Sequence, residues 1–216
     1  MIQYHGLEIS WLGHDSFRLK RGLSVIIDPY KISSSEEVDI ILITHEHFDH
    51  LSSEDLKKVI GPKTIAISMQ MCAQALATLG IAEVRIVKAG DVLDVKGISI
   101  EAVESYNTNK FKEPGIVFHP REDGKLGFVI DFGGVRVYHS GDTDDIPEMA
   151  NIKADIALLP VSGTYVMTAE EAAEAVKKIE PKLAIPMHYG TIVGSTVDAQ
   201  RFKDLASCDV QILERE

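Results

Sequence analysis

The sequence predicts an α/β fold in which sheets form the middle and helices cover them. Three observations favour this class. The run DIILIT (39–44) is continuously apolar and rich in isoleucine, as in strands that are buried on both faces. The stretch from about Val84 to Tyr138 is rich in strand-forming residues, and the last third of the chain alternates strand-like with helix-like segments. Strand-rich blocks within such an alternation are typical of layered α/β proteins.

The first part of the chain places elements on both sides of that apolar run. Three short strands, separated by Gly, Ser and Asp turn residues, precede it: LEISWL (7–12), FRLK (17–20) and SVIID (24–28). After it, SSEDLKKVIG (52–61) is predicted to be a helix, because serine can cap its start, acids occupy its first turn and Gly61 can end it. A strand at KTIAIS (63–68) and a helix at QMCAQALATLG (70–80) follow.

The last third alternates regularly between strands and helices. The predicted elements are a strand at DIALLPV (155–161), a helix at TAEEAAEAVKKIE (168–180), a strand at KLAIPM (182–187), a helix at TVDAQRFKDLA (196–206) and a strand at CDVQIL (208–213). The first helix places Ala172, Ala173, Val176 and Ile179 on one face, with Glu and Lys opposite, which predicts a surface helix on a core. Upstream, SYNTNKFKEPG (105–115) interrupts the strand-rich region with polar residues.

Composition bounds the class of protein. A length of 216 residues predicts one domain over 1–216, and 45% hydrophobic with 25% charged residues is the balance of an ordinary globular protein. No apolar run reaches the length of a membrane span and the N-terminus lacks a signal-peptide pattern, so we expect a cytoplasmic protein with no membrane partner. The net charge of −11 argues against a nucleic-acid partner, and the two cysteines have no CxxC spacing.

Side chains that favour metals follow directly on the buried strand. His45 and His47 are two positions apart, so extended backbone puts them on one side of the chain, and Asp49 and His50 follow where the chain turns. Imidazole and carboxylate groups together suit zinc and similar divalent metals. Four such ligands, close together and offered in two directions, are more than one ion needs from a single segment, which indicates two ions. The zinc-protease pattern HExxH does not fit, because Asp49 stands at its fifth position.

The segment THEHFDH (44–50) resembles the HxHxDH signature of the metallo-β-lactamase superfamily. Two later segments agree: VYHSGDT (137–143) is similar to the GDT segment of that superfamily, and AIPMHYG (184–190) to the strand that carries its last histidine. The opening WLGHDSF (11–17) and the block from GTYVMTAEEA to IPMHYG resemble the branch that contains ascorbate-6-phosphate lactonase. This resemblance implies a four-layer αβ/βα sandwich with a dinuclear metal site at one edge of the two sheets.

The resemblance also implies a ligand set for two metals. The first metal would be bound by His45 and His47, the second by Asp49, His50 and His188, and Asp142 would bridge them. The superfamily places one more histidine after a strand that is here ISIEAVES (98–105). At that point this chain has Asn107.

Two arrangements could complete the first site. His119, a dozen residues after Asn107 in GIVFHP, could return to the sheet edge, or Asn107 or water could complete a weaker site, because an amide oxygen is a poor zinc ligand compared with imidazole. We favour His119, because a loop histidine can reach a position that a strand end leaves open. If His119 is not a ligand, it is expected to be an exposed loop residue before Pro120.

Four further residues are predicted to bind substrate or to support the ligands: His14, Asn107, Lys110 and Tyr189. His14 lies in a turn between the first two predicted strands, and in the lactonase branch such a histidine stands near the metals. Lys110 could hold an anionic group of the substrate or lie on a solvated face. Tyr189 could donate a hydrogen bond to a developing oxyanion or pack against the sheet edge.

Three other titratable side chains have simpler interpretations. Asp28 follows a predicted strand and could orient a ligand histidine or be an ordinary turn carboxylate. His139 is expected to be a partly buried histidine that is hydrogen-bonded to a neighbour. His5 is expected to be exposed.

Two ions held close together predict hydrolysis. A water shared by both ions loses a proton near neutral pH, and the hydroxide attacks a carbonyl or phosphoryl centre. Asp49 or Asp142 can orient that nucleophile and accept its proton, so these are the predicted catalytic residues. The expected cofactors are two divalent ions, zinc in the first place, although the same ligands accept manganese, iron or nickel. The expected reaction cleaves an ester, lactone or phosphodiester bond in a small-molecule substrate.

Two functions from other classes are the alternatives. A nuclease of the same fold would need a basic surface, which the net charge of −11 disfavours. A non-catalytic metal-binding protein would be favoured if Asn107 stands in the site and His119 lies elsewhere. The sequence leaves a homo-oligomer open.

Overall fold

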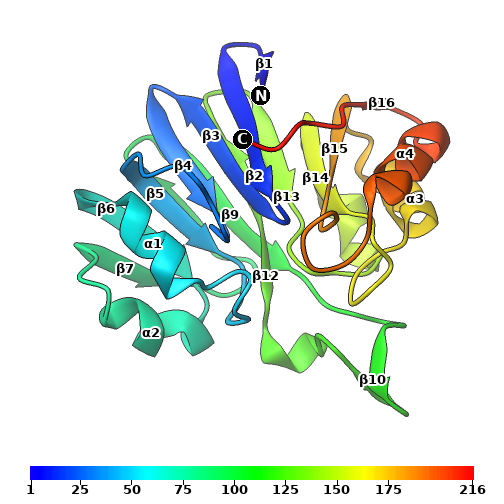
Figure 1. The fold of residues 1–216 in the computed structure, drawn as a ribbon, viewed down its shortest axis with the longest axis horizontal. Coiled ribbons are helices and arrows are strands. Elements are labelled where there is room, and N and C mark those ends of the chain that lie inside the picture. The colour runs from blue at the N-terminus through cyan, green and yellow to red at the C-terminus, as the bar shows by residue number, and fades with distance from the viewer. The chain divides into compact units, whose positions relative to one another are not determined.

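The structure is a computed structural model that describes all residues from 1 to 216. Its contacts divide the chain into two compact units. Unit 1 comprises Met1–Lys88 together with Leu213–Glu216, and unit 2 comprises Ala89–Ile212. Each unit contains one seven-stranded sheet and its own helices. Figure 1 labels most of these elements. The prediction of a single domain over 1–216 stays a prediction.

The sheet of unit 1 follows the order of the chain. Its strands, in order, are β1 (Ile2–Tyr4), β2 (Leu7–Gly13), β3 (Ser16–Arg21), β4 (Leu23–Ile27), β5 (Val38–Ile43), β6 (Ile60–Ser68) and β7 (Glu83–Ile86). The pairs from β1 to β4 are antiparallel, and the pairs from β4 to β7 are parallel. The buried strand predicted from its isoleucines is confirmed as β5, in the parallel part of the sheet. Its C-terminal end leads directly into THEHFDH.

The helices of unit 1 differ from the prediction at their ends. Helix α1 (Ser53–Val59) begins after the N-cap Ser52 as predicted, but it stops before Gly61, because Ile60 pairs with Val38 as the first residue of β6. The predicted helix at 70–80 is shorter: a 3₁₀ turn η1 (Gln70–Cys72) precedes α2 (Ala73–Ala77), which packs on β7.

The last residues of the chain complete unit 1. The backbone N–H of Glu216 donates to the carbonyl of Trp11 at 3.0 Å, and Nε of Arg215 donates to the carbonyl of Leu12 at 3.0 Å. Ser10 Oγ donates to the Glu216 carboxylate at 2.8 Å, across 206 positions of sequence. The C-terminal segment therefore lies along β2, just before the turn that carries His14.

The sheet of unit 2 is also mixed. Its strands, in spatial order, are β16 (Asp209–Val210), β15 (Leu183–Met187), β14 (Ile156–Pro160), β13 (Arg136–His139), β12 (Leu126–Asp131), β9 (Ile98–Glu104) and β8 (Val92–Val95). The pairs from β8 to β13 are antiparallel, and the pairs from β13 to β16 are parallel. The predicted strand at 208–213 is wrong in length, because only Asp209 and Val210 pair with β15.

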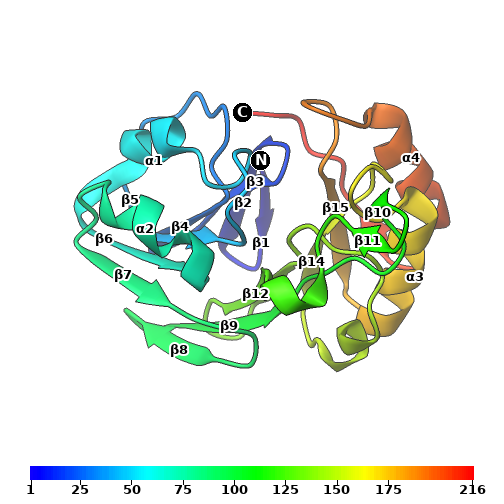
Figure 2. The same cartoon turned by 90° about the horizontal axis from the view of Figure 1, so that it is seen from below.

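The helices of unit 2 agree closely with the sequence. Helix α3 (Ala169–Ile179) starts at a capping box of Thr168 and Glu171, and α4 (Thr196–Leu205) starts at one of Ser195 and Asp198. The four residues predicted to face the core from α3 are all buried. Helices α3 and α4 pack against each other and on β14 and β15 (Figure 2).

The polar stretch between β9 and β12 contains elements that the sequence did not predict. Strands β10 (Phe111–Glu113) and β11 (Ile116–Val117) form a two-stranded hairpin, and a 3₁₀ turn η2 (Arg121–Asp123) follows. A further 3₁₀ turn, η3 (Pro147–Asn151), precedes β14. No helix in either unit is both long and apolar enough to cross a membrane.

Candidate functional site

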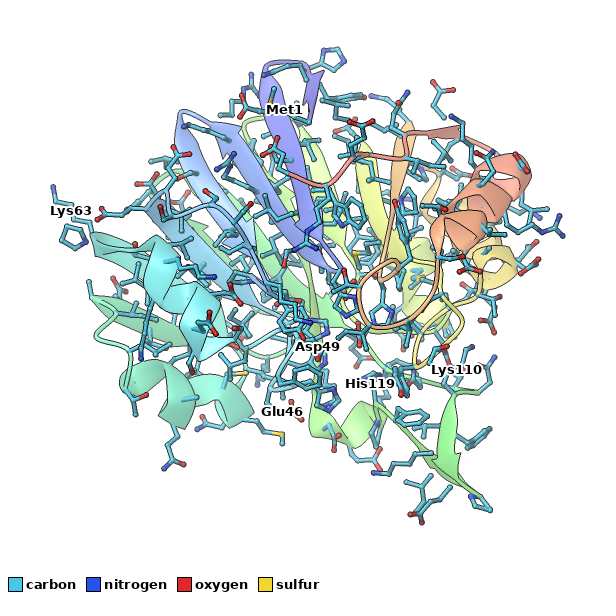
Figure 3. The ribbon with its side chains drawn as sticks, viewed as in Figure 1. Met1, Glu46, Asp49, Lys63, Lys110 and His119 are labelled. Carbon is cyan, nitrogen blue, oxygen red and sulfur yellow. The ribbon has the colours of Figure 1, made fainter.

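Unit 1 gathers six metal-favouring side chains, which we call the unit 1 cluster: His14, Asp15, His45, His47, Asp49 and His50. Four of them come from the loop after β5, where Figure 3 labels Asp49, and two come from the turn between β2 and β3. The carboxyl ends of parallel strands are where open α/β sheets commonly bind ligands, and the end of β5 is such a place. The sequence thus predicted where this part of the site begins.

Two histidines of the loop after β5, His45 and His50, are held at Nδ1 by a neighbouring side chain. Nδ1 of His50 lies 2.8 Å from Oδ2 of Asp28, and Nδ1 of His45 lies 3.0 Å from Oγ1 of Thr44. Nε2 of His45 faces Nδ1 of His47 at 3.0 Å. His45 and His50 therefore present Nε2, whereas His47 presents Nδ1.

Asp28 is the support beneath this loop. Its carboxylate accepts from the backbone N–H of Thr44 at 2.8 Å and from Oγ1 of Thr44 at 2.6 Å, besides facing His50. Its own N–H donates to the carbonyl of Leu42 in β5 at 3.0 Å. Of the two interpretations of Asp28, the structure favours the one in which it orients a ligand histidine.

His14 lies beside the predicted ligands of unit 1. Its Nε2 is 3.1 Å from Oδ2 of Asp49 and 3.4 Å from Oδ2 of Asp15, and the indole of Trp11 donates to its backbone carbonyl at 2.8 Å. The ligand atoms of His14, Asp15 and His50 all lie within 4.8 Å of one another, and the three residues are buried. Sequence reasoning missed Asp15, although the adjacent His-Asp pair in WLGHDSF was a usable signal.

Unit 2 contains a second group, which we call the unit 2 cluster: His119, Asp142 and His188. Oδ2 of Asp142 lies 3.6 Å from Nε2 of His119 and 3.5 Å from Nε2 of His188. Asp142 follows β13 and His188 follows β15, which are both strands of the parallel part of the sheet. All three side chains are almost completely buried.

His119 and Asn107 are in direct contact, although the sequence offered them as alternatives. Nδ1 of His119 lies 2.9 Å from Oδ1 of Asn107, and the backbone N–H of His119 donates to the same oxygen at 3.0 Å. The expectation of an exposed His119 is wrong, since only 1% of its surface is accessible. The backbone explains why: the N–H of Asn107 donates to the His119 carbonyl at 2.8 Å, so the chain returns after the hairpin.

His188 is held in a similar way at its far nitrogen. Its Nδ1 lies 2.9 Å from Oγ of Ser162, a residue just after β14 that sequence reasoning did not single out. Tyr189, the next residue, is buried with 2% of its surface accessible, and burial raises the pKa of its phenol to about 12. Its hydroxyl therefore stays protonated at neutral pH, while its burial favours the packing role over contact with a substrate.

Backbone strain coincides with the candidate residues. His14, Asp28 and His188 adopt positive φ values of 53°, 44° and 57°. Such conformations are uncommon outside glycine and cost on the order of 1–3 kcal/mol each. They persist where surrounding contacts fix the side chain, and here each one lies directly after a strand or its terminal glycine.

The remaining sequence-selected residues have definite partners within their units. Nζ of Lys110, labelled in Figure 3, lies 2.7 Å from the Glu171 carboxylate and 3.2 Å from that of Asp144, so it is not on a solvated face. His139 is buried and accepts a hydrogen bond from the N–H of Gly141 at 3.2 Å, as expected of a structural histidine. His5 is exposed, as predicted.

The donor sets fit divalent metal ions. In unit 2, the imidazole nitrogens lie 3.5 to 3.6 Å from the carboxylate oxygen of Asp142. This distance is longer than a good hydrogen bond, but it suits two ligands of a common ion. The opposite nitrogen of each ring is held by Asn107 or Ser162, as is usual for histidines that bind metals. Unit 1 repeats this arrangement at His45 and His50.

Comparisons with known proteins agree with the geometry of each unit. Residues 8–188 match the family model described as the β-lactamase superfamily domain. A UPF0173 metal-dependent hydrolase of Methanosarcina mazei is 34% identical over 220 residues, which cover 94% of this chain and 92% of the relative. The chain therefore belongs to the metallo-β-lactamase superfamily and, within it, to the UPF0173 metal-dependent hydrolases.

Solved structures show the same fold. A crystal structure from Parabacteroides distasonis superposes with a TM-score of 0.83 at 35% identity, covering 97% of this chain and 94% of that one. The metallo-β-lactamase fold protein YhfI from Bacillus subtilis gives a TM-score of 0.74 at 12% identity, covering 97% and 96% of the two chains. The predicted fold class is confirmed: two mixed seven-stranded sheets with flanking helices form a metallo-β-lactamase fold.

Proposed function

We propose that this protein is a dinuclear metal-dependent hydrolase that cleaves an ester, lactone or phosphodiester bond in a small molecule. One observation carries the proposal: four of the five predicted ligand histidines, namely His45, His50, His119 and His188, are held at one ring nitrogen and present the other to a neighbouring carboxylate or imidazole. Buried polar groups are arranged in this way when they serve a metal. Membership of a family whose relatives are named metal-dependent hydrolases supports it.

The proposed ligands belong to the two clusters, without His14 and Asp15. Unit 1 would supply His45, His47, Asp49 and His50, and unit 2 would supply His119, Asp142 and His188. Zinc is the first candidate for the metal, since imidazole and carboxylate suit it, and manganese, iron or nickel are the others. When bound, such cations supply an activated water and polarise the bond that is cleaved.

The chain's own groups would handle the proton and the geometry. Nε2 of His14 lies 3.1 Å from Oδ2 of Asp49, and with a proton on this nitrogen it would donate to the carboxylate and fix it. We propose that Oδ1 of Asp49 orients the nucleophilic water and accepts its proton. Asp142 would serve as a ligand together with His119 and His188, because Nε2 of both rings faces its Oδ2.

We also propose that the protein is related to the lactonase branch of the superfamily and is located in the cytoplasm. The WLGHDSF and MHYG segments support a lactonase-like relative, so lactones come first in a substrate screen. A cytoplasmic location stays a prediction from the N-terminal sequence.

The test combines metal analysis with a substrate screen. Metal-free protein is loaded separately with zinc and manganese, freed of excess metal, and analysed by elemental methods. About two ions per chain are expected, as a dinuclear site requires. Each loaded form is then assayed on lactones, esters, small phosphodiesters and single-stranded DNA.

The possible outcomes separate the candidate functions. Hydrolysis of a small substrate that His188→Ala abolishes supports the proposal, whereas His5→Ala, at an exposed histidine outside both clusters, should leave the rate unchanged. No retained metal would reject the metalloenzyme. Cleavage of DNA alone would indicate the nuclease, and two bound ions with no hydrolysis would indicate a metal-binding protein.

A further inference from the structure

We propose that Asn107 is a positioning residue that fixes His119 as a metal ligand through Nε2, an inference that rests on the proposed metal site. Asn107 and His119 lie 12 positions apart in the sequence, and both are buried in unit 2. Asn107 stands where the superfamily pattern expects a histidine. Its role is to hold His119, which takes the place of the histidine that the pattern expects.

The hydrogen bonds of Asn107 determine which way its amide points. Its Nδ2 donates to Oδ1 of Asp144 at 3.2 Å and to the carbonyl of Tyr165 at 2.9 Å. Its Oδ1 accepts the backbone N–H of His119 and faces the ring Nδ1. A flipped amide would set NH₂ against the His119 N–H and oxygen against two acceptors, so the network permits one orientation.

The orientation of the amide fixes the proton on His119. Oδ1 of Asn107 can only accept, so Nδ1 of His119 must carry a proton, and in the neutral ring Nε2 then has the lone pair. That nitrogen is the one that lies 3.6 Å from Oδ2 of Asp142. Ring nitrogens with lone pairs and a carboxylate oxygen attract a cation between them.

The same contacts argue against Asn107 as a ligand itself. An amide oxygen has two acceptor positions, and the backbone and ring N–H groups of His119 occupy both. The alternative in which Asn107 completes the first metal site therefore requires breaking the network. His119 needs no such change.

Asn107 can position a ring because it is itself rigidly held. Asp144 accepts the N–H groups of Thr108 at 2.6 Å and Asn109 at 2.8 Å, besides the amide of Asn107. The N–H of Asp144 donates to the carbonyl of Tyr106 at 2.9 Å, which docks this loop on the GDT segment that carries Asp142. The loop thus couples Asn107 to the strand end that supplies a proposed ligand.

The first experiment measures metal affinity in a double-mutant cycle. Competition with a chromophoric chelator gives the affinities for the two zinc ions in wild type, Asn107→Ala, His119→Ala and the double variant. Asn107→Ala should lower the affinity for one zinc ion about 10–100-fold and leave the affinity for the other unchanged, as expected for loss of a partner that orients a ligand. The double variant should match His119→Ala, because a residue that acts only through His119 adds nothing once the ring is gone.

The matched control is Asn109→Ala. Asn109 has the same side chain two positions away, but its amide donates to the partly exposed Glu171 carboxylate at 2.7 Å and does not contact His119. Both affinities should stay at the wild-type values. A loss equal to that of Asn107→Ala would show that only the general order of the loop matters, and would overturn the positioning role.

The second experiment reads the tautomer of His119 directly. Side-chain ¹⁵N NMR of metal-free protein should show Nδ1 protonated and Nε2 unprotonated, and Asn107→Ala should give a mixture. An unprotonated Nδ1 in wild type would overturn the inference.

The two experiments separate this inference from the proposed function. If His119→Ala changes neither affinity, the proposed ligand set is wrong. If His119→Ala lowers the affinity for one ion and Asn107→Ala does not, His119 is still supported as a ligand and only the positioning role of Asn107 is rejected.

Discussion

The two clusters are built from the sequence in different ways. Unit 1 takes His45, His47, Asp49 and His50 from a single loop after β5, so their spacing is encoded locally. Unit 2 takes its three residues from three places, each after a different element. A contiguous loop can be read as a metal motif from its spacing, whereas dispersed ligands are assembled only by the sheet.

The supports of the two clusters differ as well. In unit 1 the buried carboxylate of Asp28 holds His50 and Thr44 together. In unit 2 neutral groups do the same work, namely the amide of Asn107 and the hydroxyl of Ser162. Hydrogen bonds to a charged group are stronger than those to neutral ones, so unit 1 should be the more firmly preorganised cluster.

The largest effect is expected at Asp142. Two ligand histidines of unit 2 face one oxygen of this carboxylate, and the Asp142→Asn variant removes its charge. Hydrolysis should be lost. The affinity for metal should fall by more than the factor of about 10–100 that follows the loss of a supporting partner, and the metal content should fall with it. Elemental analysis and the rate with the best substrate measure both. His139→Ala should keep its metal, and similar losses in the two variants would show that the GDT segment is wrongly assigned.

The next effect compares the supports of the two clusters. Asp28→Asn replaces one acceptor oxygen by a donor that must face Thr44 or His50, so it should weaken one ion about 10–100-fold. Ser162→Ala removes a neutral partner of His188 and should weaken an ion less. Chelator competition on both variants gives the order. A larger loss at Ser162 would reverse the conclusion about which cluster is better supported.

A smaller effect concerns stability and pH. Asp55 and Glu171 are each the third residue of a helix and tie a neighbouring loop to it: Asp55 accepts from the backbone N–H groups of Lys31 and Ile32, and Glu171 from Asn109 and Lys110. Burial would raise the pKa of both carboxyls, but hydrogen bonds outweigh this effect. The strongest of these hydrogen bonds comes from Lys58 in the case of Asp55 and from Lys110 in the case of Glu171. The pKa of each lies below its usual range.

A depressed pKa in the folded state stabilises the protein above the pKa of the unfolded chain, about 4, and this stabilisation is lost as the pH falls through the folded value. Asp55→Asn and Glu171→Gln should each cost about 1–3 kcal/mol at pH 7. Urea unfolding of metal-free protein should show the difference from wild type shrinking below pH 4 or so. A difference that is constant with pH would mean that the charge is not responsible.

The smallest effect is expected at Tyr189. Because its ring is buried and its pKa is raised to about 12, Tyr189→Phe should leave metal content unchanged and alter kcat by less than about tenfold. A loss of about 100-fold or more in kcat, with unchanged metal binding, would instead assign the phenol to an oxyanion.

What the sequence predicted well was local. The run of β5 and the spacing of His45 to His50 lie within a dozen positions, and α3 follows from its one apolar face. These features depend on neighbours that are already adjacent in the chain. Sequence reasoning therefore reached them without knowledge of the tertiary structure.

What the sequence could not supply was the pairing of distant groups. Asn107 and His119 were treated as alternatives because nothing local shows that the chain returns after an unpredicted hairpin. Ser162 is an ordinary serine until the parallel pairing of β14 and β15 brings it beside His188. Helix α1 likewise lost its predicted end to the pairing of Ile60 with Val38.

The return of the chain's last residues to unit 1 bears on the order in which the protein folds. The strands β1 to β7 are synthesised before unit 2, yet Arg215 and Glu216, which bond to the backbone of β2, are synthesised after it. Unit 2, by contrast, is one continuous stretch. On the ribosome, unit 2 can therefore collect all of its own residues before unit 1 does, and β2 gains its contacts with Arg215 and Glu216 only after unit 2 has been synthesised.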